Sequence, residues 1–365
     1  MKIQIHPLKK GEMKPLFTNL DGLGFCKTFT DMMFTMDHTE VEGWRNPEIK
    51  KFAPFLMEPS TMVLHYAQEI FEGLKAFRTK KGEINLFRPE MNAKRFNRSA
   101  ARLCMPAIPE PDFLEIVETM VRLEKRWIPN STGAALYIRP FMFASDSTLG
   151  VRASSNYIFC MILSPVGPYY AEGFNPISLY VSDEYTRASK GGTGEAKTGG
   201  NYAASLLAGR VAREKGCAQV LWLDGAEHRY VEEVGAMNIF FVFGDRLVTP
   251  KLNGSILPGV TRDSVLALAR DMGIKTDERA VSIDEVIGGI TAGSVTEIFG
   301  AGTAASISPV GNLRYQDRDY IVANRKVGPL SQKMFETLRG IQYGEIPDAF
   351  NWIRKVPIEE KPAMA

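Results

Sequence analysis

The stretch Lys190-Gly-Gly-Thr-Gly-Glu-Ala-Lys197-Thr-Gly-Gly-Asn-Tyr202 places five glycines around a central lysine. Glycine lets the backbone take positive φ or come close to a ligand, so this loop is suited to holding a small molecule. Lys197 is then either a cation for a phosphate group or, once deprotonated, a nucleophile that forms a Schiff base. Without further support, a flexible surface loop with an ordinary lysine is the simplest interpretation.

A phosphate-binding loop is one specific alternative, because residues 191–198 nearly match the pattern G-x-x-x-x-G-K-[ST]. Position 196, however, is alanine where the pattern requires glycine. We also expect Gly199 and Gly200 to interrupt the helix that has to begin at the lysine of such a loop. The preceding residues 185–190 are too polar for a buried strand. A P-loop NTPase is therefore a distant alternative.

The composition excludes several other classes of function. The chain has 365 residues, 45% of them hydrophobic, and single cores stop growing near roughly 250–300 residues, so two domains are expected. Lys+Arg 44 against Asp+Glu 42 leaves a net charge of +2, which gives no basic field for nucleic acid. No apolar run approaches the about 20 residues of a membrane span. Residues 1–10 resemble no targeting segment, so we expect the protein in the cytoplasm.

The cysteines and histidines exclude the commonest metal and redox sites. Four histidines are scattered along the chain, and the four cysteines lie far apart in sequence, at Cys26, Cys104, Cys160 and Cys217. We expect reduced, mostly buried thiols and no metal site. The chemistry must come from other groups.

The hydrophobic pattern predicts a mixed α/β chain without the regular strand–helix alternation of a doubly wound fold. Strands are expected at residues 84–88, 134–143, 157–163, 177–182, 219–223, 237–243, 246–249 and 294–299. Helices are expected at 90–104, 111–127, 201–215, 261–272 (ended by Gly273), after the capping box Ser282-Ile-Asp-Glu285, and at 329–341. Ser164-Pro-Val-Gly-Pro-Tyr-Tyr170 indicates a linker. The expected division is a domain at 1–164, a linker at 165–175 and a domain at 176–365.

Other segments accompany the glycine loop in a fixed order: Phe29-Thr-Asp31, His65-Tyr-Ala-Gln-Glu-Ile-Phe-Glu-Gly-Leu-Lys-Ala-Phe77, Leu86-Phe-Arg-Pro-Glu-Met-Asn-Ala-Lys-Arg95, Leu136-Tyr-Ile-Arg-Pro140, Glu233-Val-Gly-Ala-Met-Asn-Ile-Phe240, Leu257-Pro-Gly-Val-Thr-Arg262 and Phe299-Gly-Ala-Gly-Thr-Ala304. Together they resemble the branched-chain amino-acid aminotransferases, class IV (fold-type-IV) enzymes that depend on pyridoxal 5'-phosphate (PLP). The resemblance implies a smaller N-terminal α/β domain and a larger C-terminal domain with a mixed, barrel-like sheet.

The resemblance also implies a role for each residue of a PLP site. Lys197 would hold the cofactor and shuttle the substrate proton, Glu233 would pair with the ring nitrogen, and Tyr202 would donate to the ring oxygen. The phosphate would be bound by two arginines and by backbone N–H groups, from Arg95, Arg187, Val260, Thr261 and Thr303.

Each of these residues also has a plainer interpretation. Glu233 can be an exposed strand-edge acid, as we expect for Glu232. Tyr202 can be a half-buried aromatic residue at a helix start, and Arg95 a basic residue on a solvated helix face.

A substrate pocket follows from the same resemblance. Its positions are Phe29, Tyr66, Phe71, Tyr137, Arg139, Val151, Ala236, Thr303 and Ala304. Tyr137 and Arg139 are two residues apart on an expected strand, so both side chains point to one face and can accept the γ-carboxylate of glutamate. Some members of the family, notably animal ones, often have threonine at the position of Ala236, so any hydroxyl contact from there is lost. Val151 would reach the active site of a partner subunit, which implies a homodimer.

The function that the resemblance implies is reversible, ping-pong transamination of leucine, isoleucine and valine with 2-oxoglutarate, as in branched-chain amino-acid biosynthesis. The partners would be these small molecules only, without nucleic acid, membrane or metal. Close alternatives are other class IV enzymes, a D-amino-acid aminotransferase or an aminodeoxychorismate lyase. Ala305 and Ser308 stand where some members carry a redox CxxC pair, so we expect no thiol switch.

Overall fold

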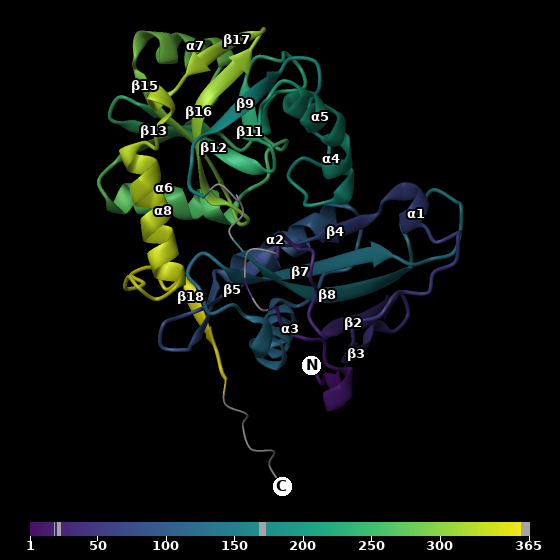
Figure 1. Ribbon diagram of the computed structural model, residues 1–365. Helices are drawn as coiled ribbons and strands as arrows, with labels where there is room; N and C mark the ends of the chain where they lie inside the picture. The colour runs from purple at the N-terminus through teal and green to yellow at the C-terminus, as the bar shows by residue number, and fades with distance from the viewer. Residues whose placement is uncertain (18, 20–22, 168–172, 359–365) are drawn as a thin grey trace. The chain divides into compact units, whose positions relative to one another are not determined.

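The protein is described here from a computed structural model, which covers residues 1–17, 19, 23–167 and 173–358. The chain divides into two compact units (Figure 1). Unit 1 comprises Met1–Tyr169 together with Gly340–Ala365, and unit 2 comprises Tyr170–Arg339. Each unit has its own nine-stranded sheet. Among the described residues, no helix combines the length and the apolar character needed to cross a membrane.

The sheet of unit 1 has the strand order β1-β3-β2-β8-β7-β5-β6-β18, and β4 pairs with β7. Its strands are β1 (Gln4–Ile5), β2 (Met32–Thr39), β3 (Gly43–Lys51), β4 (Glu69–Phe71), β5 (Leu74–Arg78), β6 (Ile84–Phe87), β7 (Ala135–Ala144), β8 (Asn156–Val166) and β18 (Ile353–Val356). Its helical segments are η1 (Lys10–Glu12), α1 (Val63–Tyr66), α2 (Pro89–Arg102), α3 (Glu110–Leu123) and η2 (Lys125–Trp127). The central pair β7–β8 is a long antiparallel hairpin joined by residues 145–155.

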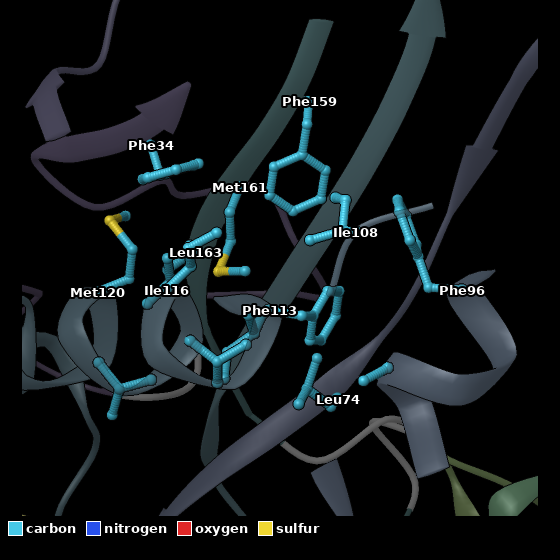
Figure 2. Packing of buried hydrophobic residues seen from close by; sticks show 14 of the residues in the cluster. Phe34, Leu74, Phe96, Ile108, Phe113, Ile116, Met120, Phe159, Met161 and Leu163 are labelled. Carbon is cyan, nitrogen blue, oxygen red and sulfur yellow. The ribbon is translucent and has the colours of Figure 1, made fainter. Parts of the chain in front are cut away.

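The core of unit 1 lies between this sheet and helices α2 and α3. Figure 2 shows its aromatic centre, where Phe159 of β8 meets Phe96 of α2 and Phe113 of α3. The ring of Phe159 lies edge-on to Phe96 at 5.5 Å between centroids. Apolar residues at helical spacing on both helices supply the rest of this packing, as their sequence pattern predicts.

The sheet of unit 2 closes on itself. Six strands form a ring, β11-β10-β9-β16-β15-β12 and back to β11, because β11 also pairs with β12. The strands are β9 (Ile177–Ser182), β10 (Gln219–Leu223), β11 (Val231–Val234), β12 (Met237–Phe243), β13 (Arg246–Pro250), β14 (Lys275–Arg279), β15 (Val295–Gly302), β16 (Ser306–Tyr315) and β17 (Arg318–Ile321). Closure satisfies the hydrogen-bonding groups of both edges and leaves a small barrel.

Helices pack around this barrel (Figure 1). They are α4 (Gly199–Ala204), α5 (Leu206–Glu214), α6 (Val260–Asp271), α7 (Ile283–Ala292), the turn η3 (Ala323–Arg325) and α8 (Pro329–Gln342), which continues into unit 1. α5 packs on β9 and β10, α6 on β14 and β15, and α7 on β15 and β17. Ser282 caps α7 by accepting a hydrogen bond from the Glu285 N–H, which confirms the predicted helix start, whereas the Glu285 carboxylate pairs with Arg279.

The predicted mixed α/β fold with a barrel-like second sheet is confirmed, with local differences. The helix expected at 201–215 is two helices, α4 and α5, and Gly199 and Gly200 begin the first of them instead of interrupting it. The prediction assigned no strand to β1–β5, β11, β14 or β16–β18. All four cysteines are free; Cys160 and Cys217 are buried as expected, whereas Cys104 is exposed.

The division of the chain also differs from the expected one. Gly340–Ala365 belongs to unit 1, where β18 pairs antiparallel with β6, whereas the expected division places this segment in the second domain. With this segment unit 1 is the longer of the two, the reverse of the expected sizes. The expected linker at 165–175 begins inside β8, and residues 168–172 lie outside the described part of the chain.

Candidate active site

Lys197 lies in the glycine loop, two residues before the start of α4. Its Nζ donates a hydrogen bond to the Tyr202 hydroxyl at 2.7 Å and lies 5.0 Å from the centre of that ring. Asn201 holds the loop, since its Nδ2 donates to the carbonyls of Thr193 at 2.8 Å and Ala196 at 2.9 Å. The loop therefore presents a lysine amine and a phenol side by side, in a fixed position.

Glu233 lies on β11 inside the barrel sheet and is 2% exposed. Its Oε1 accepts hydrogen bonds from the Leu257 N–H at 2.8 Å and from Asn238 Nδ2 at 3.4 Å. Its Oε2 forms an ion pair with Nε of Arg187 at 2.6 Å. Burial raises the pKa of Glu233, and the charges of Arg187 and Lys197 oppose that rise. Glu233 is thus a buried carboxylate held by a buried cation, not the exposed acid of the plainer interpretation.

Arg187 makes further contacts with the backbone of unit 2. Besides pairing with Glu233, it donates from Nη1 to the Ser255 carbonyl and from Nη2 to the Gly194 carbonyl, both at 3.2 Å. Arg187 and Tyr202 also line a cavity of about 170 Å³, together with Gly235 and the predicted substrate residue Ala236.

The N-terminus of α6 supplies backbone donors in the same unit. α6 begins at Val260, after Gly259 in an extended conformation without a side-chain cap. A Cβ on Gly259 would lie 2.0 Å from Oδ1 of Asn238, so a larger residue would displace the side chain that contacts Glu233. Val260 and Thr261 are buried in the first turn. An uncapped helix N-terminus favours an anion, as the predicted phosphate role requires.

Thr303 and Ala304 lie in the turn that joins β15 to β16. β15 pairs with β12, where Ala301 is opposite Asn238. The turn therefore follows directly on the strand that lies next to Asn238, in unit 2.

The remaining predicted site residues are in unit 1. Arg95 is 4% exposed, and its Nε and Nη2 donate to the two oxygens of Glu72 at 2.6 and 2.9 Å. It is therefore a buried, ion-paired arginine and not a residue of a solvated helix face. Its role toward a phosphate stays a prediction.

The structure brings together three of the predicted pocket residues of unit 1. Nη2 of Arg139 donates to the Tyr137 hydroxyl at 3.2 Å, on one face of β7, and its guanidinium lies 4.7 Å from the Phe71 ring centre. Phe29 instead stacks on Phe52 at 5.4 Å.

Two predicted pocket residues lie at the loop that joins β7 and β8. The Tyr66 hydroxyl donates to the Leu149 carbonyl in this loop. Val151 belongs to the same loop and is 84% exposed.

Sequence reasoning missed several residues that hold the site. Asn238 lies in the segment that carried the resemblance, yet an asparagine on a strand gives no signal of its contact with Glu233. Glu232 was expected to be exposed, and this was wrong: it is 4% exposed and accepts hydrogen bonds from Asn253 and Ser255. Gly73 is also required, because a Cβ there would lie 2.0 Å from the Tyr137 hydroxyl.

Comparisons with known proteins agree with this geometry. The family described as "Amino-transferase class IV" matches residues 69–313. The chain is 48% identical over 356 residues to branched-chain-amino-acid aminotransferase 2 of Bacillus subtilis, covering 98% of this chain and 97% of that protein. It is 51% identical over 335 residues to branched-chain-amino-acid transaminase 1 of the same organism, covering 92% and 94%.

Solved structures give the same result for the fold. The branched-chain amino acid aminotransferase of Escherichia coli superposes with a TM-score of 0.74 at 27% identity, covering 90% of this chain and 99% of that one. A second branched-chain amino acid aminotransferase, solved with pyridoxamine 5'-phosphate, gives a TM-score of 0.75 at 26% identity, covering 89% and 98%. With a family match over more than half of its length and relatives near half identity, the chain belongs to the class IV aminotransferases.

Proposed function

We propose that this chain catalyses the PLP-dependent transamination of leucine, isoleucine and valine with 2-oxoglutarate, which gives branched 2-oxo acids and glutamate. The observation that carries the proposal is the group formed by Lys197, Tyr202 and the buried Glu233 in unit 2. The names of relatives near half identity over nearly the full chain support the substrate class. They favour it over a D-amino-acid aminotransferase or an aminodeoxychorismate lyase.

The residues of unit 2 fit PLP by the chemistry of their donors and acceptors. When bound, the cofactor supplies an electron sink for the bond broken at the substrate Cα. Lys197 would supply the amine that holds the cofactor and would move the substrate proton, Tyr202 would supply a donor for the ring oxygen, and Glu233 would supply an acceptor for the ring nitrogen. The α6 N-terminus at Val260 and Thr261 supplies N–H groups for the phosphate.

The two kinds of substrate make opposite demands on one pocket. A branched side chain needs apolar surface, whereas 2-oxoglutarate brings a second carboxylate. The Tyr137–Arg139 pair, with its guanidinium over the Phe71 ring, offers both surfaces in unit 1. An arginine that lies on an aromatic face can receive a carboxylate and still present apolar carbon to leucine.

The proposal includes a homodimer in the cytoplasm. Val151 and Leu149 are 84% and 63% exposed on the loop between β7 and β8, where the resemblance implies that Val151 meets a partner subunit. Light scattering is expected to give twice the chain mass of 40.6 kDa; a monomer would contradict this part of the proposal. Cell fractionation tests the location.

The test of the activity is a substrate panel. Each L-amino acid and its D-enantiomer is offered with 2-oxoglutarate, and glutamate formation is measured. We expect turnover of L-leucine, L-isoleucine and L-valine, and none of the D-enantiomers. Preferential turnover of a D-amino acid would assign one of the other class IV activities. So would a yellow protein that turns over none of the amino acids.

The Lys197→Ala variant tests the mechanism. Because the lysine carries the cofactor and moves the proton, we expect turnover to fall by at least roughly 10³-fold and the yellow colour of the lysine-bound cofactor to disappear. Lys190→Ala, at the exposed start of the same loop, is the matched control and should retain both. Full turnover by Lys197→Ala would refute the assignment.

A further inference from the structure

Arg187 is placed for a role other than the phosphate contact that the resemblance implies. We propose that Arg187 is a positioning residue for Glu233, which keeps this carboxylate ionised and aimed so that it can hold the cofactor's ring nitrogen in its protonated form. The inference rests on the PLP-dependent function proposed above.

The contacts of Arg187 are directed at Glu233 and at the backbone that surrounds it. The side chains of Arg187 and Glu233 are 7% and 3% exposed, and Nε and Oε2 are 2.6 Å apart. The other two nitrogens donate to the carbonyls of Ser255 and Gly194, each at 3.2 Å. All three guanidinium nitrogens therefore have protein partners within unit 2. A planar fork with fixed donors makes three such contacts at once, which a lysine cannot do.

The acceptor positions of Glu233 show what its partner must be. A carboxylate has about four acceptor positions. Oε1 accepts from the Leu257 N–H and from Asn238, and Oε2 accepts from Arg187. The position that is left is on Oε2, the oxygen that Arg187 holds. A protonated ring nitrogen is the donor that completes this set.

The charge of Arg187 decides the state of Glu233. Burial favours the protonated form of Glu233, and the largest opposing influence is the charge of Arg187. Without that charge a buried carboxyl group takes up a proton and can no longer stabilise a positive charge on the ring. The ring would then be a weaker electron sink.

The backbone that holds Arg187 is itself fixed. The Ser255 N–H donates to Asn253 Oδ1 at 3.0 Å, and the Ser255 hydroxyl bonds to the buried Glu232. Gly194 approaches Ser255 so closely that a Cβ would lie 2.1 Å from the Ser255 carbonyl oxygen. The glycine loop and the segment before α6 thus meet at Arg187, which fixes the direction of its guanidinium.

The experiment compares Arg187→Gln, Glu233→Gln and the double variant R187Q/E233Q in the holoenzyme. Arg210→Gln is the control, since Arg210 is 66% exposed on α5. We expect R187Q to lower kcat by roughly ten- to a hundredfold with little change in the KM for leucine. In the E233Q background the same change should cost less than about twofold, because its target is already neutral.

A second readout separates this role from a phosphate contact. Binding of PLP and of phosphate-free pyridoxal to the apoenzyme is measured by absorbance for each variant. A positioning role weakens both ligands by the same factor and alters the pH titration of the bound cofactor's colour. Loss of PLP affinity alone, with pyridoxal unchanged, would assign the phosphate contact and overturn the inference, as would equal costs of R187Q in both backgrounds.

The experiment distinguishes a wrong proposed function from a wrong inference about Arg187. If R187Q alone does not fold, R187Q/E233Q still leaves no unpaired buried charge. Arg187→Lys keeps the charge but not the three directed contacts, and its loss of kcat should likewise fall below about twofold in the E233Q background. If the proposed function is wrong, the unaltered protein will not turn over leucine, whether or not it binds PLP. If only this inference is wrong, the unaltered protein will do both.

Discussion

Gly194 and Gly200 belong to the same glycine loop but have different surroundings. A Cβ on Gly194 would lie 2.1 Å from the Ser255 carbonyl oxygen, whereas a Cβ on Gly200 would meet nothing within 4 Å. The sequence shows two equivalent glycines. The structure shows that one is required by a close approach of two backbones and that the other is not.

The pair Gly194→Ala and Gly200→Ala tests this difference. Gly194→Ala forces the backbone apart and is expected to lower the free energy of unfolding by about 1–3 kcal/mol and to weaken cofactor binding. Gly200→Ala adds a better helix former to α4 and should raise stability by up to about 1 kcal/mol. Urea unfolding measures both, and equal losses in the two variants would contradict the argument.

Glu124 is a buried acid that the proposed chemistry does not use. It is 2% exposed after the end of α3 and accepts a hydrogen bond from the Asp31 N–H at 3.3 Å. Burial, and then the nearby charge of Asp31, raise the pKa of Glu124 from 4.5 to about 7. Arg126 does not cancel this effect, because it forms its ion pair with Asp31 at 2.6 Å.

The sign of the resulting pH dependence is fixed by the raised pKa. The folded protein binds the Glu124 proton more tightly than the unfolded chain does, so this stabilising contribution is complete below pH 4.5 and is lost as pH rises through about 7. Glu124→Gln should therefore match the wild type at pH 5 and exceed its unfolding free energy at pH 8 by on the order of 1–3 kcal/mol. Urea titrations at both pH values test this, and a difference independent of pH would exclude it.

Single residues also show how much of the site could be predicted from the sequence. Lys197, Tyr202 and Glu233 were predicted from the resemblance, and the structure places all three in unit 2. The partner of Arg187 could not be predicted, because it depends on β11 and the segment before the glycine loop meeting in space. The burial of Glu232 was mispredicted for the same reason, since its partners Asn253 and Ser255 come from a loop about 20 residues away.

At the scale of elements, a carboxylate from a strand caps the first turn of α8. Glu297 of β15 is 7% exposed and accepts hydrogen bonds from the Leu330 N–H and the Ser331 N–H, each at 2.9 Å. The Ser331 hydroxyl donates to it at 2.7 Å. Gly328 makes room, because a Cβ there would lie 2.0 Å from the Glu297 carboxyl carbon. A charge at the positive end of the helix stabilises its first turn.

Glu297→Ala should remove this capping. The expected loss is about 1–3 kcal/mol of unfolding free energy, with faster hydrogen exchange at Leu330 and Ser331, because a part-buried and a buried N–H group lose their acceptor. Glu336→Gln is the control, since its contact with Gln332 on α8 is exposed. Unchanged exchange at both amides in E297A would show that the capping contributes nothing.

Elements with a strong local pattern were predictable, and those defined by pairing were not. β9 and β10 have the predicted bounds, Ile177–Ser182 and Gln219–Leu223, because short apolar runs flanked by polar residues indicate buried strands. β3 contains Pro47 and Asn46 at a φ of 51°, and β16 contains Pro309 and Gly311, so neither has the pattern of a strand. Their neighbours in the sheets hold them extended.

At the scale of the whole molecule, unit 1 is built from two distant segments of the chain. β18 pairs with β6 from Ile353 opposite Phe87 to Val356 opposite Ile84. Trp352, which precedes β18, is 8% exposed and lies under the Arg88 guanidinium at 4.9 Å. The Trp352 carbonyl also accepts a hydrogen bond from the Arg88 N–H at 2.7 Å.

Trp352→Ala should therefore weaken unit 1. Removing a buried indole costs about 3 kcal/mol, and we expect limited proteolysis to release the C-terminal segment before it cuts within 177–321. Leu64→Ala, at a 60% exposed position of unit 1, should leave the cleavage pattern unchanged. First cleavage inside the barrel of unit 2 would contradict this view of how the C-terminal segment is held.

The pairing of β18 with β6 in the first sheet has a consequence for synthesis. A ribosome synthesises β6 about 270 residues before it synthesises β18. The β6 edge of the sheet of unit 1 therefore stays unpaired while the barrel of unit 2 is synthesised. A chain that stops after the barrel of unit 2 and before β18 has every residue of the cofactor loop and still lacks the strand that pairs with β6. Its unpaired edge is open to pairing with another chain, so we expect such a truncated chain to associate with itself and to aggregate.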